Sequence, residues 1–482
     1  MVTPAVNREV DVIVIGMGAA GIAAAITAHD RGASVLILEK EAEELAGGNT
    51  RVSGGSWFEN LDPQRAATYL RSLAGDRPVD EAVVQSWAEE TARNAEWMQS
   101  IGANVQTVGD FGPEYPELPG SDAYGGYLSV DGVMGEKKTF EALCSALESR
   151  GIDVHYETPG RRLRTDSDGS VIGVETEVDG RTVTFGARGG VILATGGFQA
   201  NKQMVRDYLN LVDPPLWGAP SATGDGHKMA MAVGADLWHM NNHMAIAGVP
   251  VPGSRHAFYQ SFEFRKGFIW VAGDGARFTN EQPQVGHGQA HVHGRYELFP
   301  EHHMHIIFDE ETRKAGPISL PRRHMGVGWL YLVENLDWSD DNLAEVEQGL
   351  VTRANTLAEL AEALGVPSEQ LEQTIQRWNE DCQAGSDSQF ARSSDTLTPL
   401  DNPPYYAVST QPMIGWTNGG PRRNQFGQVV HVEGYVIPGL YAAGEISSTY
   451  SWSKDGGFHL ADGLAFGRIA GADASKRAQA DS

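Results

Sequence analysis

The chain has 482 residues, of which 41% are hydrophobic and 21% are charged. This is the composition of a globular protein that exceeds one ordinary core, so we expect two domains of unequal size. The formal net charge of −26 argues against nucleic acid and anionic membrane surfaces as partners. Cys144 and Cys382, the two cysteines, provide neither a disulfide framework nor a CxxC redox or metal pair. With no apolar leader region and no membrane-length apolar run, we expect a cytoplasmic protein without a membrane span.

The first fifty residues predict a βαβ unit. We expect a strand over about 10–15, a helix over about 19–31 and a strand over about 34–39, followed by a glycine-rich loop at 46–55. The glycines Gly16, Gly18 and Gly21 form a GxGxxG pattern between the first strand and the helix. Glu39, eighteen residues after Gly21, closes the second strand. This context is typical of a dinucleotide-binding turn.

The three glycines have separate physical roles in such a turn. The first makes the turn, the second lets a pyrophosphate approach the backbone, and the third lets the helix pack closely on the strand. The helix N-terminus offers unpaired N–H groups and a partial positive charge to the phosphates. Glu39 is then placed to bind a ribose. The alternative is a glycine-rich turn without a ligand.

The middle of the chain changes character twice. Helices are predicted over about 64–101 and 139–150, then a hairpin over 171–185 that turns at Asp179-Gly180, and a buried strand over about 190–198. Asp225 lies near the start of another helix. From about 242 to 407 aromatic and histidine content rises, two helices are expected over about 341–382, and Thr356-Leu-Ala-Glu359 forms a capping box. After a linker at 399–404, strands and a last helix over about 457–476 return.

A second motif, Ile437-Pro-Gly-Leu-Tyr-Ala-Ala-Gly444-Glu445, lies some four hundred residues after the first. The two motifs together predict FAD, because its long body needs opposite ends of the chain side by side. The predicted fold is α/β: a Rossmann-like FAD-binding domain with an inserted α+β substrate (cap) domain. We expect the FAD-binding domain at 1–241 and 408–482, and the cap at 242–407.

Several short elements occur in the order seen in the fumarate reductase flavoprotein superfamily, which the chain resembles over nearly its whole length. That group includes fumarate reductases, 3-ketosteroid Δ1-dehydrogenases and tricarballylate dehydrogenase. The resemblance implies hydride exchange between flavin N5 and a CH–CH or C=C bond beside a carbonyl or carboxylate. The elements are Gly47-Gly-Asn-Thr50, Ala194-Thr-Gly-Gly197, Thr223-Gly-Asp-Gly226, Gly234-Ala-Asp-Leu237, Arg277-Phe-Thr-Asn-Glu281, Gly439-Leu-Tyr-Ala-Ala-Gly-Glu445 and Phe466-Gly-Arg-Ile-Ala-Gly471.

The resemblance also implies how FAD is held. Glu39 would bind the adenosine ribose, Asp225 would lie close to the FAD, and Glu445 would bind the ribityl chain. Members with covalent flavin carry a histidine at the position that resembles Asn49, so we predict noncovalent FAD. At Gly456 and Gly457, the positive N-terminal end of the last helix would face the negative charge of reduced flavin. The predicted FAD-binding residues are Gly16, Gly18, Ala19, Ala20, Gly21, Glu39, Lys40, Gly48, Asn49, Thr50, Ser53, Gly54, Gly55, Ala194, Thr195, Gly196, Asp225, Gly444, Glu445, Gly457 and Leu460.

The chain departs from the fumarate reductases at three positions. By resemblance, Lys454 replaces the substrate-binding arginine of the family. A lysine lacks the two parallel N–H groups with which an arginine binds a carboxylate. The proton-donating arginine expected shortly after Glu281 is absent, and Trp416 replaces a histidine. A C4-dicarboxylate clamp is therefore disfavoured. The sequence therefore favours dehydrogenation of a cyclic ketone or another molecule of low charge.

The comparison with the ketosteroid dehydrogenases is mixed. Tyr115 lies in a segment that resembles their Tyr-containing Pro-Glu element, but the tyrosine expected near Val285 is missing. Tyr115 could exchange a proton if a nearby cation lowered its pKa, and Lys454 could supply that charge or hold a substrate carboxylate. The alternatives are a packed tyrosine and a surface lysine. The catalytic candidates are Tyr115, Lys454, His287 and Tyr450.

Histidines and aromatic residues leave further alternatives open. His287 and His291 have helical spacing, yet no Asp, Glu or Cys stands at a ligand-like offset, so we predict no metal. Family position instead favours the roof of the active site for this segment. His302, His303 and His305 are expected on a strand or loop. A partly apolar pocket, or else ordinary core, is expected from Trp416, Tyr450, Trp452 and Phe458.

The leading functional hypothesis is an FAD-dependent oxidoreductase acting on CH–CH groups, a dehydrogenase of a cyclic ketone or similar small molecule. A reductase of an unsaturated acid or enone is the alternative within this class. A flavin-binding sensor or assembly protein without catalysis is the alternative from another class. The expected partners are a small-molecule substrate and an unidentified electron acceptor or donor.

Overall fold

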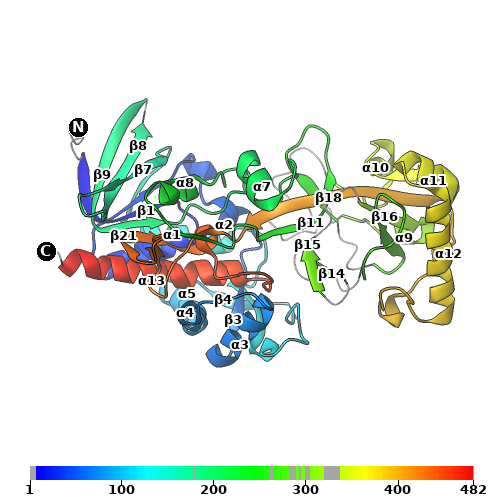
Figure 1. Ribbon diagram of the computed structural model, residues 1–482, viewed down its shortest axis with the longest axis horizontal. Helices are drawn as coiled ribbons and strands as arrows, with labels where there is room; N and C mark the ends of the chain where they lie inside the picture. The colour runs from blue at the N-terminus through cyan, green and yellow to red at the C-terminus, as the bar shows by residue number, and fades with distance from the viewer. Residues whose placement is uncertain are drawn as a thin grey trace.

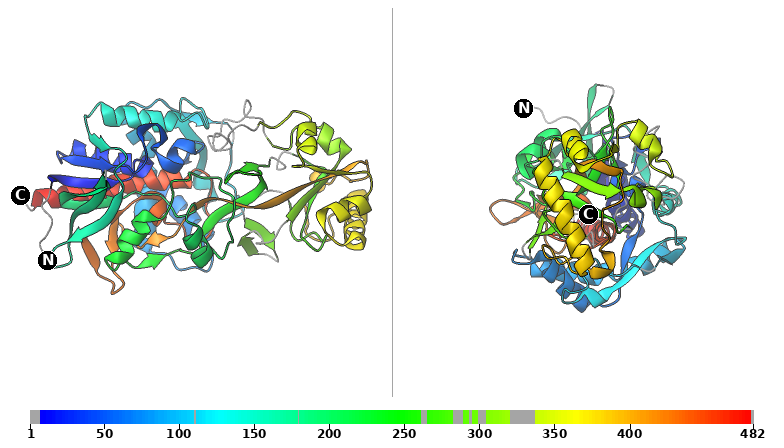
Figure 2. Two further views of the ribbon diagram at one scale, coloured as in Figure 1. Left: turned by 90° about the horizontal axis from the view of Figure 1, so that it is seen from above. Right: turned by 90° about the vertical axis from the view of Figure 1, so that its right-hand side faces the viewer.

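The structure is a computed structural model that describes residues 7–109, 111–178, 180–260, 265–281, 289–292, 295–298, 304–319 and 337–480. The molecule is elongated (Figure 1). A large sheet lies at the end that carries both termini, and a second sheet lies toward the opposite end, as a view from above also shows (Figure 2). The fold is mixed α/β, as predicted. Among the described residues, no helix is both long and apolar enough to cross a membrane.

The large sheet has its N-terminal strand near the centre. Its main path runs β20-β21-β9-β1-β2-β6, and β7 and β8 extend it beyond β9. β1 pairs in parallel with β2 and β9, and β21 pairs in parallel with β9, so the motifs from the two ends of the chain lie on either side of β9. The strands are β1 Arg8–Ile15, β2 Val35–Leu38, β6 Asp153–His155, β7 Gly160–Thr165, β8 Val171–Val178, β9 Arg181–Leu193, β20 Gln428–Val430 and β21 Val436–Ala442.

The predicted βαβ opening and hairpin are confirmed. The buried run of β1 suits a strand covered on both faces, and α1 (Ala19–Asp30) follows it and leads to β2. β8 pairs antiparallel with β9 up to Val178 opposite Arg181. Asp179, in the predicted turn, lies outside the described residues.

The last helix packs directly on the first. α13 (Phe458–Ala480) begins immediately after Gly456-Gly457, as predicted, and ends a few residues beyond the expected bound. A Cβ on Gly467 would lie 2.4 Å from the carbonyl oxygen of Ala20, and one on Gly471 would lie 2.3 Å from that of Ala24. Glycine therefore sets the close approach of α1 and α13, which brings the two ends of the chain together.

The predicted helices after the glycine-rich loop are present and flank a small sheet. The Asp62 and Asp80 side chains cap the first two, each accepting two backbone N–H bonds. The small sheet has the order β3-β5-β4. These elements are α2 Gly48–Val52, β3 Trp57–Asn60, α3 Pro63–Ala74, α4 Glu81–Thr91, α5 Asn94–Ser100, β4 Val105–Val108, β5 Tyr124–Val130 and α6 Lys138–Glu148.

The second sheet has the order β12-β11-β18-β16-β13, with β17 also paired to β18. β18 is 13 residues long and runs from the far end of the molecule back toward the large sheet (Figure 1). The predicted domain boundary at 407/408 falls inside this strand, and the division of the chain into three segments stays a prediction. The strands are β11 His243–Pro250, β12 Ala257–Tyr259, β13 Phe268–Val271, β16 Met304–Asp309, β17 Thr352–Ala354 and β18 Tyr405–Thr417.

The remaining elements complete the two ends of the molecule. The Thr356 hydroxyl accepts from the Glu359 N–H at 3.2 Å, as a capping box requires, but the Glu359 carboxylate accepts from the N–H of Asn355 at 2.9 Å. The elements are α7 Lys202–Leu209, α8 Asp225–Ala232, β10 Leu237–Trp238, β14 Gln289–Val292, β15 Arg295–Leu298, α9 Glu310–Lys314, α10 Leu343–Glu347, α11 Leu357–Leu364, α12 Ser368–Ala384 and β19 Gly420–Pro421.

A buried ionic network explains the Arg277-Phe-Thr-Asn-Glu281 element. Arg277 donates to Glu281 at 2.7 and 2.8 Å and to Asp387 at 3.0 and 3.1 Å, and Arg392 donates to Glu281 at 3.3 Å. All four side chains are buried. The network ties the loop after β13 to the segment after α12, and each charge in it has an opposite partner.

Candidate active site

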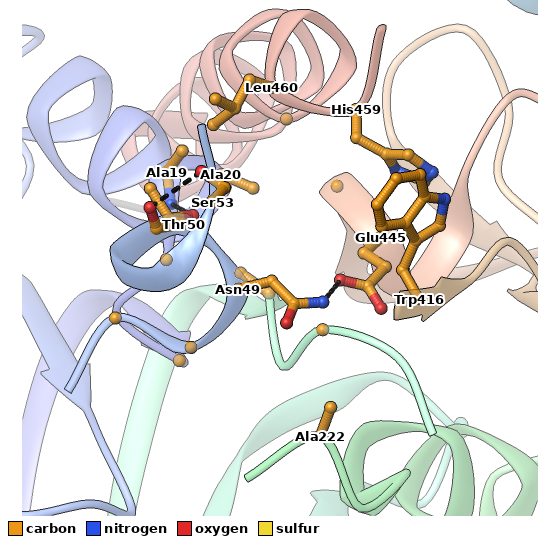
Figure 3. Close-up of a pocket in the computed structure, with 18 of the residues that line it drawn as sticks. Ala19, Ala20, Asn49, Thr50, Ser53, Ala222, Trp416, Glu445, His459 and Leu460 are labelled. Carbon is orange, nitrogen blue, oxygen red and sulfur yellow. Dashed lines mark hydrogen bonds between the residues drawn. The ribbon is translucent and has the colours of Figure 1, made fainter. Parts of the chain in front are cut away.

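A cavity of about 560 Å³ opens where α1, α2, the end of β9 and the start of α13 converge. It is lined by every predicted FAD-binding residue except Gly21, and Figure 3 shows several of them around the open space. Those lining residues are Gly16, Gly18, Ala19, Ala20, Glu39, Lys40, Gly48, Asn49, Thr50, Ser53, Gly54, Gly55, Ala194, Thr195, Gly196, Asp225, Gly444, Glu445, Gly457 and Leu460.

The turn between β1 and α1 needs glycine for reasons of space. Gly16 has φ +100°, and a Cβ there would lie 2.5 Å from the carbonyl oxygen of Ala194. A Cβ on Gly21 would lie 2.0 Å from the carbonyl oxygen of Gly16, so Gly21 allows α1 to pack against the turn instead of lining the cavity. The Ala19 N–H donates to the Thr50 hydroxyl at 2.9 Å, which joins the start of α1 to α2.

Acidic and basic side chains fix the ends of neighbouring strands. Glu39 follows β2, and its buried carboxylate accepts from the backbone N–H groups of Met17 at 2.9 Å and Glu41 at 3.0 Å. Lys40 donates to Asp225 at 2.8 Å and to Thr223 at 2.7 Å. Burial alone would raise the pKa of Asp225, but the hydrogen bond and charge of Lys40 lower it below its ordinary value.

Asn49 and Glu445 meet across the cavity (Figure 3). The Asn49 amide donates to the Glu445 carboxylate at 2.7 Å, while its oxygen accepts from the Ala219 N–H at 2.7 Å. Burial raises the pKa of Glu445 to about 7, although hydrogen bonds from Asn49 and the backbone act in the opposite direction. A carboxyl group that is about half protonated near pH 7 can both donate and accept hydrogen bonds at this point.

The raised pKa of Glu445 predicts a pH-dependent stability. As pH rises from 4.5 to about 7, the unfolded state loses this proton and the folded state keeps it, so the free energy of unfolding falls. Glu445→Gln should remove that loss and gain up to about 3 kcal/mol over the wild type across this interval. Urea unfolding of both flavin-free proteins at several pH values measures it. A constant difference between the two proteins from pH 5 to pH 8 would contradict the assignment.

The far end of the cavity is aromatic. Trp217 stacks on Tyr259 with ring centroids 5.5 Å apart and on Trp416 at 6.1 Å, and His459 meets the edge of Trp416 at 5.1 Å. Tyr127 and Phe111 also line it, and Phe111 is 47% exposed. This end thus has flat apolar walls, with one exposed ring among its lining residues.

Lys454 is the cation at this aromatic end. It is 6% exposed, lines the cavity, and its Nζ lies 4.5 Å from the centre of the Trp416 ring. Burial lowers the pKa of Lys454 to about 8, and the charges of Glu114 and Asp455 act against this shift. None of the described lining residues is an arginine. Lys40, the other lysine that lines the cavity, is already paired with Asp225.

The two tyrosine candidates lie elsewhere. Tyr115 and Tyr450 are fully buried in the core and are not among the described residues that line the cavity. The Tyr450 hydroxyl donates to the Phe458 carbonyl at 2.6 Å and accepts from the Trp87 indole at 3.1 Å, and burial raises its pKa well above the ordinary value. Because neither tyrosine lines the cavity, neither is assigned a catalytic role.

The expected aromatic pocket is only partly assembled. Trp416 lines the cavity, but Phe458 packs in the core and Trp452 lies under the guanidinium of Arg77 at 3.6 Å. The sequence did not predict five lining residues that carry aromatic or imidazole rings, because these rings converge from elements distant in the chain and follow no local spacing. They are Phe111, Tyr127, Trp217, Tyr259 and His459.

Much of the histidine-rich segment lies outside the residues that the structure describes. His287, Val285, His302 and His303 lie outside the described residues. His291 belongs to β14, and His305 lies on β16 with its Nδ1 3.0 Å from the Ser409 hydroxyl. Over the described part of the chain, no group of three or more His, Cys, Asp or Glu side chains is arranged to hold a metal ion.

Comparison with known proteins identifies the family. Residues 11–459 match the family described as FAD binding domain. The chain is 29% identical to an NADH:fumarate oxidoreductase of Klebsiella pneumoniae (strain 342) over 98% of its own length, and spans about half (48%) of that relative. It is 27% identical to a 3-oxosteroid 1-dehydrogenase of Mycolicibacterium smegmatis (strain ATCC 700084 / mc(2)155), with 98% of each chain covered.

A solved structure shows the same fold. The 3-ketosteroid delta1-dehydrogenase of Sterolibacterium denitrificans in complex with 1,4-androstadiene-3,17-dione superimposes with a TM-score of 0.81 at 23% identity, covering 98% of this chain and 100% of that chain. The fold, the cavity at the glycine-rich turn and the family match agree. The chain belongs to the FAD-binding domain family, and it is an FAD-dependent oxidoreductase.

Proposed function

We propose that this chain holds FAD noncovalently in the cavity and dehydrogenates a CH–CH bond beside the carbonyl of a cyclic ketone or similar molecule of low charge. The observation that carries the substrate class is the aromatic end of the cavity. There Lys454 is the cation, and no arginine occurs among the described lining residues. Flat aromatic walls favour a flat or cyclic apolar body, whereas a dicarboxylate requires more than one cationic partner.

The residues present fit the cofactor. The Thr195 hydroxyl is buried, lines the cavity and has no hydrogen-bond partner among the described residues, so it could bind a polar group of the cofactor. Gly16 and Gly18 leave the turn without side chains where a pyrophosphate would approach. Asn49 and Glu445 would hold the ribityl hydroxyls, and Glu39 the ribose. Asn49 offers no imidazole for a covalent flavin bond, which supports noncovalent binding.

The chain's own groups would then do four things. When bound, FAD supplies the hydride acceptor of the reaction. The imidazole of His459, which lines the cavity beside Trp416, would accept the proton that leaves the neighbouring carbon. The Lys454 ammonium would donate a hydrogen bond to the substrate carbonyl, which acidifies the neighbouring C–H bond and stabilises the charge that develops on oxygen. The backbone at Gly456-Gly457, where α13 begins, would direct a positive dipole toward the flavin. Trp217, Tyr259 and Trp416 would exclude water from the reacting carbons.

The segment 242–407 would act as the substrate-side cap. Tyr259 of β12 supplies a wall of the cavity from the second sheet, and β18, which continues past position 407, supplies Trp416. A small-molecule substrate held between this sheet and the FAD site would be recognised by the cap and oxidised at the other domain. The electrons would leave through an acceptor that the residues do not identify.

The opposite direction, reduction of an enone or an unsaturated acid, is the second candidate. It is favoured by the relative named NADH:fumarate oxidoreductase and by the ability of Lys454 to hold a carboxylate. The two directions, and a third possibility of a flavin-binding sensor without catalysis, can be separated by the redox state of the flavin itself.

Anaerobic flavin spectroscopy on the FAD-loaded protein is the test. Saturated cyclic ketones should bleach the oxidised flavin within seconds, whereas enones and fumarate should reoxidise dithionite-reduced flavin more slowly. Faster reoxidation by enones or unsaturated acids, with no bleaching by ketones, would assign the reductase. If a broad panel of ketones, enones and unsaturated acids changes the flavin in neither direction, the dehydrogenase proposal is wrong and the sensor remains.

A further inference from the structure

A buried carboxyl group lies directly behind Lys454. Asp455 is fully buried, and its carboxylate accepts three hydrogen bonds. The Tyr69 hydroxyl of α3 donates to Oδ2 at 2.6 Å, the Glu114 N–H donates to the same oxygen at 2.9 Å, and the Gly456 N–H donates to Oδ1 at 2.7 Å. Donors from three separate segments therefore hold this side chain in one place next to the start of α13.

A second carboxyl group and the ammonium group meet at the same point. Glu114 is half-buried, and its Oε1 would lie 3.1 Å from a Cβ built on Gly456, whose own N–H binds Asp455. Lys454 donates through Nζ to the backbone carbonyl of Asp455 at 3.2 Å. The carboxyl groups of Glu114 and Asp455 and the ammonium group of Lys454 thus lie around the Asp455–Gly456 peptide, at the edge of the cavity.

Charge balance restricts how these three groups ionise together. With all three ionised, the cluster would carry one excess negative charge beside the buried Asp455, and the two carboxylates would repel one another. With one proton held between the acids, one negative charge faces one ammonium group and the cluster is neutral. The other titratable groups facing it are Tyr69 of α3 and the β5 tyrosines Tyr124 and Tyr127, and burial raises the pKa of all three above the ordinary value.

We infer that Glu114 and Asp455 share one proton, and that their remaining single negative charge keeps Lys454 in the ammonium form facing the cavity. Both acids are positioning residues, because they act on the substrate only through Lys454. The role toward a substrate rests on the proposed function, whereas the shared proton does not.

The direction of the pKa shifts supports this arrangement. Burial, and then the negative charge of Glu114, raises the pKa of Asp455, so this acid keeps a proton more readily than an exposed aspartate. Burial lowers the pKa of Lys454 and the two acids oppose that shift. Removing either acid should therefore force the other to ionise opposite Lys454, since a lone buried ammonium group is unfavourable.

Infrared difference spectroscopy of the FAD-loaded protein at pH 7 tests the shared proton without any substrate. Subtracting a variant spectrum from the wild-type spectrum should give the carbonyl-stretch band of one protonated carboxyl group for Glu114→Gln and the same band for Asp455→Asn. Lys454→Met should keep the band and move its titration to higher pH, because the balancing ammonium is gone. Glu117→Gln, an exposed acid of the same segment, is the matched control and should give no band.

Each outcome of this experiment decides the inference. A band lost in only one of the two acid variants means that the proton belongs to one acid and is not shared. Absence of the band from both differences means that both acids are ionised, which also overturns it. If Asp455→Asn fails to fold, Glu114→Gln and Lys454→Met still decide whether a proton is lost and whether Lys454 controls it. A failed search for substrates would leave the infrared result intact, so the two proposals fail separately.

Discussion

Lys454→Met is expected to lower kcat/KM for the ketone substrate by about 10²–10³-fold, the usual loss when one donor to a developing oxyanion is removed. The side chain contributes a charge at the aromatic end of the cavity, where Trp416 and its neighbours exclude water and strengthen that charge. Steady-state kinetics on protein with verified FAD content measure the effect. Methionine keeps the unbranched apolar part of the side chain and lacks the ammonium group, so the loss reports mainly the charge.

Lys454→Arg is the matched control, because arginine keeps its charge at every accessible pH. The wild type should lose activity as pH rises through about 8, where the Lys454 ammonium releases its proton, whereas Lys454→Arg, although slower at neutral pH, should show no such fall. Full turnover by Lys454→Met at full FAD loading would remove Lys454 from the site. A wild-type profile that rises through pH 8 would instead assign Lys454 as a base.

Gly16→Ala should abolish stable FAD loading. Its φ of +100° is costly for alanine, and the new Cβ would lie 2.5 Å from the carbonyl oxygen of Ala194 on the neighbouring strand. Left-handed backbone and overpacking together cost about 2–5 kcal/mol. Relief of the overlap requires β1 and the end of β9 to separate at the turn where the phosphates would bind. FAD per protein after purification and the urea midpoint measure the two consequences.

Gly32→Ala separates the two causes. Gly32 has φ +87°, but nothing lies within 4 Å of a Cβ placed there, so this variant should lose only about 1–2 kcal/mol and keep its FAD. Equal FAD content and equal stability in Gly16→Ala and Gly32→Ala would show that the turn tolerates a side chain. The phosphate-binding role assigned to Gly16 would then fail.

Secondary-structure elements were predicted well where a single helix or strand periodicity, or one helix cap, determines the local structure. The opening βαβ unit, the helices capped by Asp62 and Asp80, the hairpin of β8 and β9 and the last helix after Gly457 are all where the sequence placed them. Helix and strand periods and turn chemistry act over a few residues, so they can be read directly. The long strand β18 crosses an expected domain boundary, because its pairing partners lie far away in the chain.

The aromatic end of the cavity was harder to predict from the sequence. Lys454 lines the cavity as expected, but Tyr115 and Tyr450 are core residues, since the identity of a tyrosine does not reveal which face of its segment is buried. Tyr127, Trp217 and Tyr259 were missed because each reaches the cavity from a different element. The partnership of Asp455 with Glu114, 341 positions apart, has no local signature.

The cofactor class could be predicted from the sequence alone, because backbone geometry requires Gly16 and Gly21 at the turn and Glu39 follows at a set spacing. The sequence also predicted that the two ends of the chain come together, and both line one cavity. Tertiary packing alone reveals what the aromatic end of the cavity contains: an aromatic wall, one buried lysine and a pair of acids behind it. Burial and the distances between charges arise from packing between remote segments, and these quantities set the pKa values on which the chemistry depends.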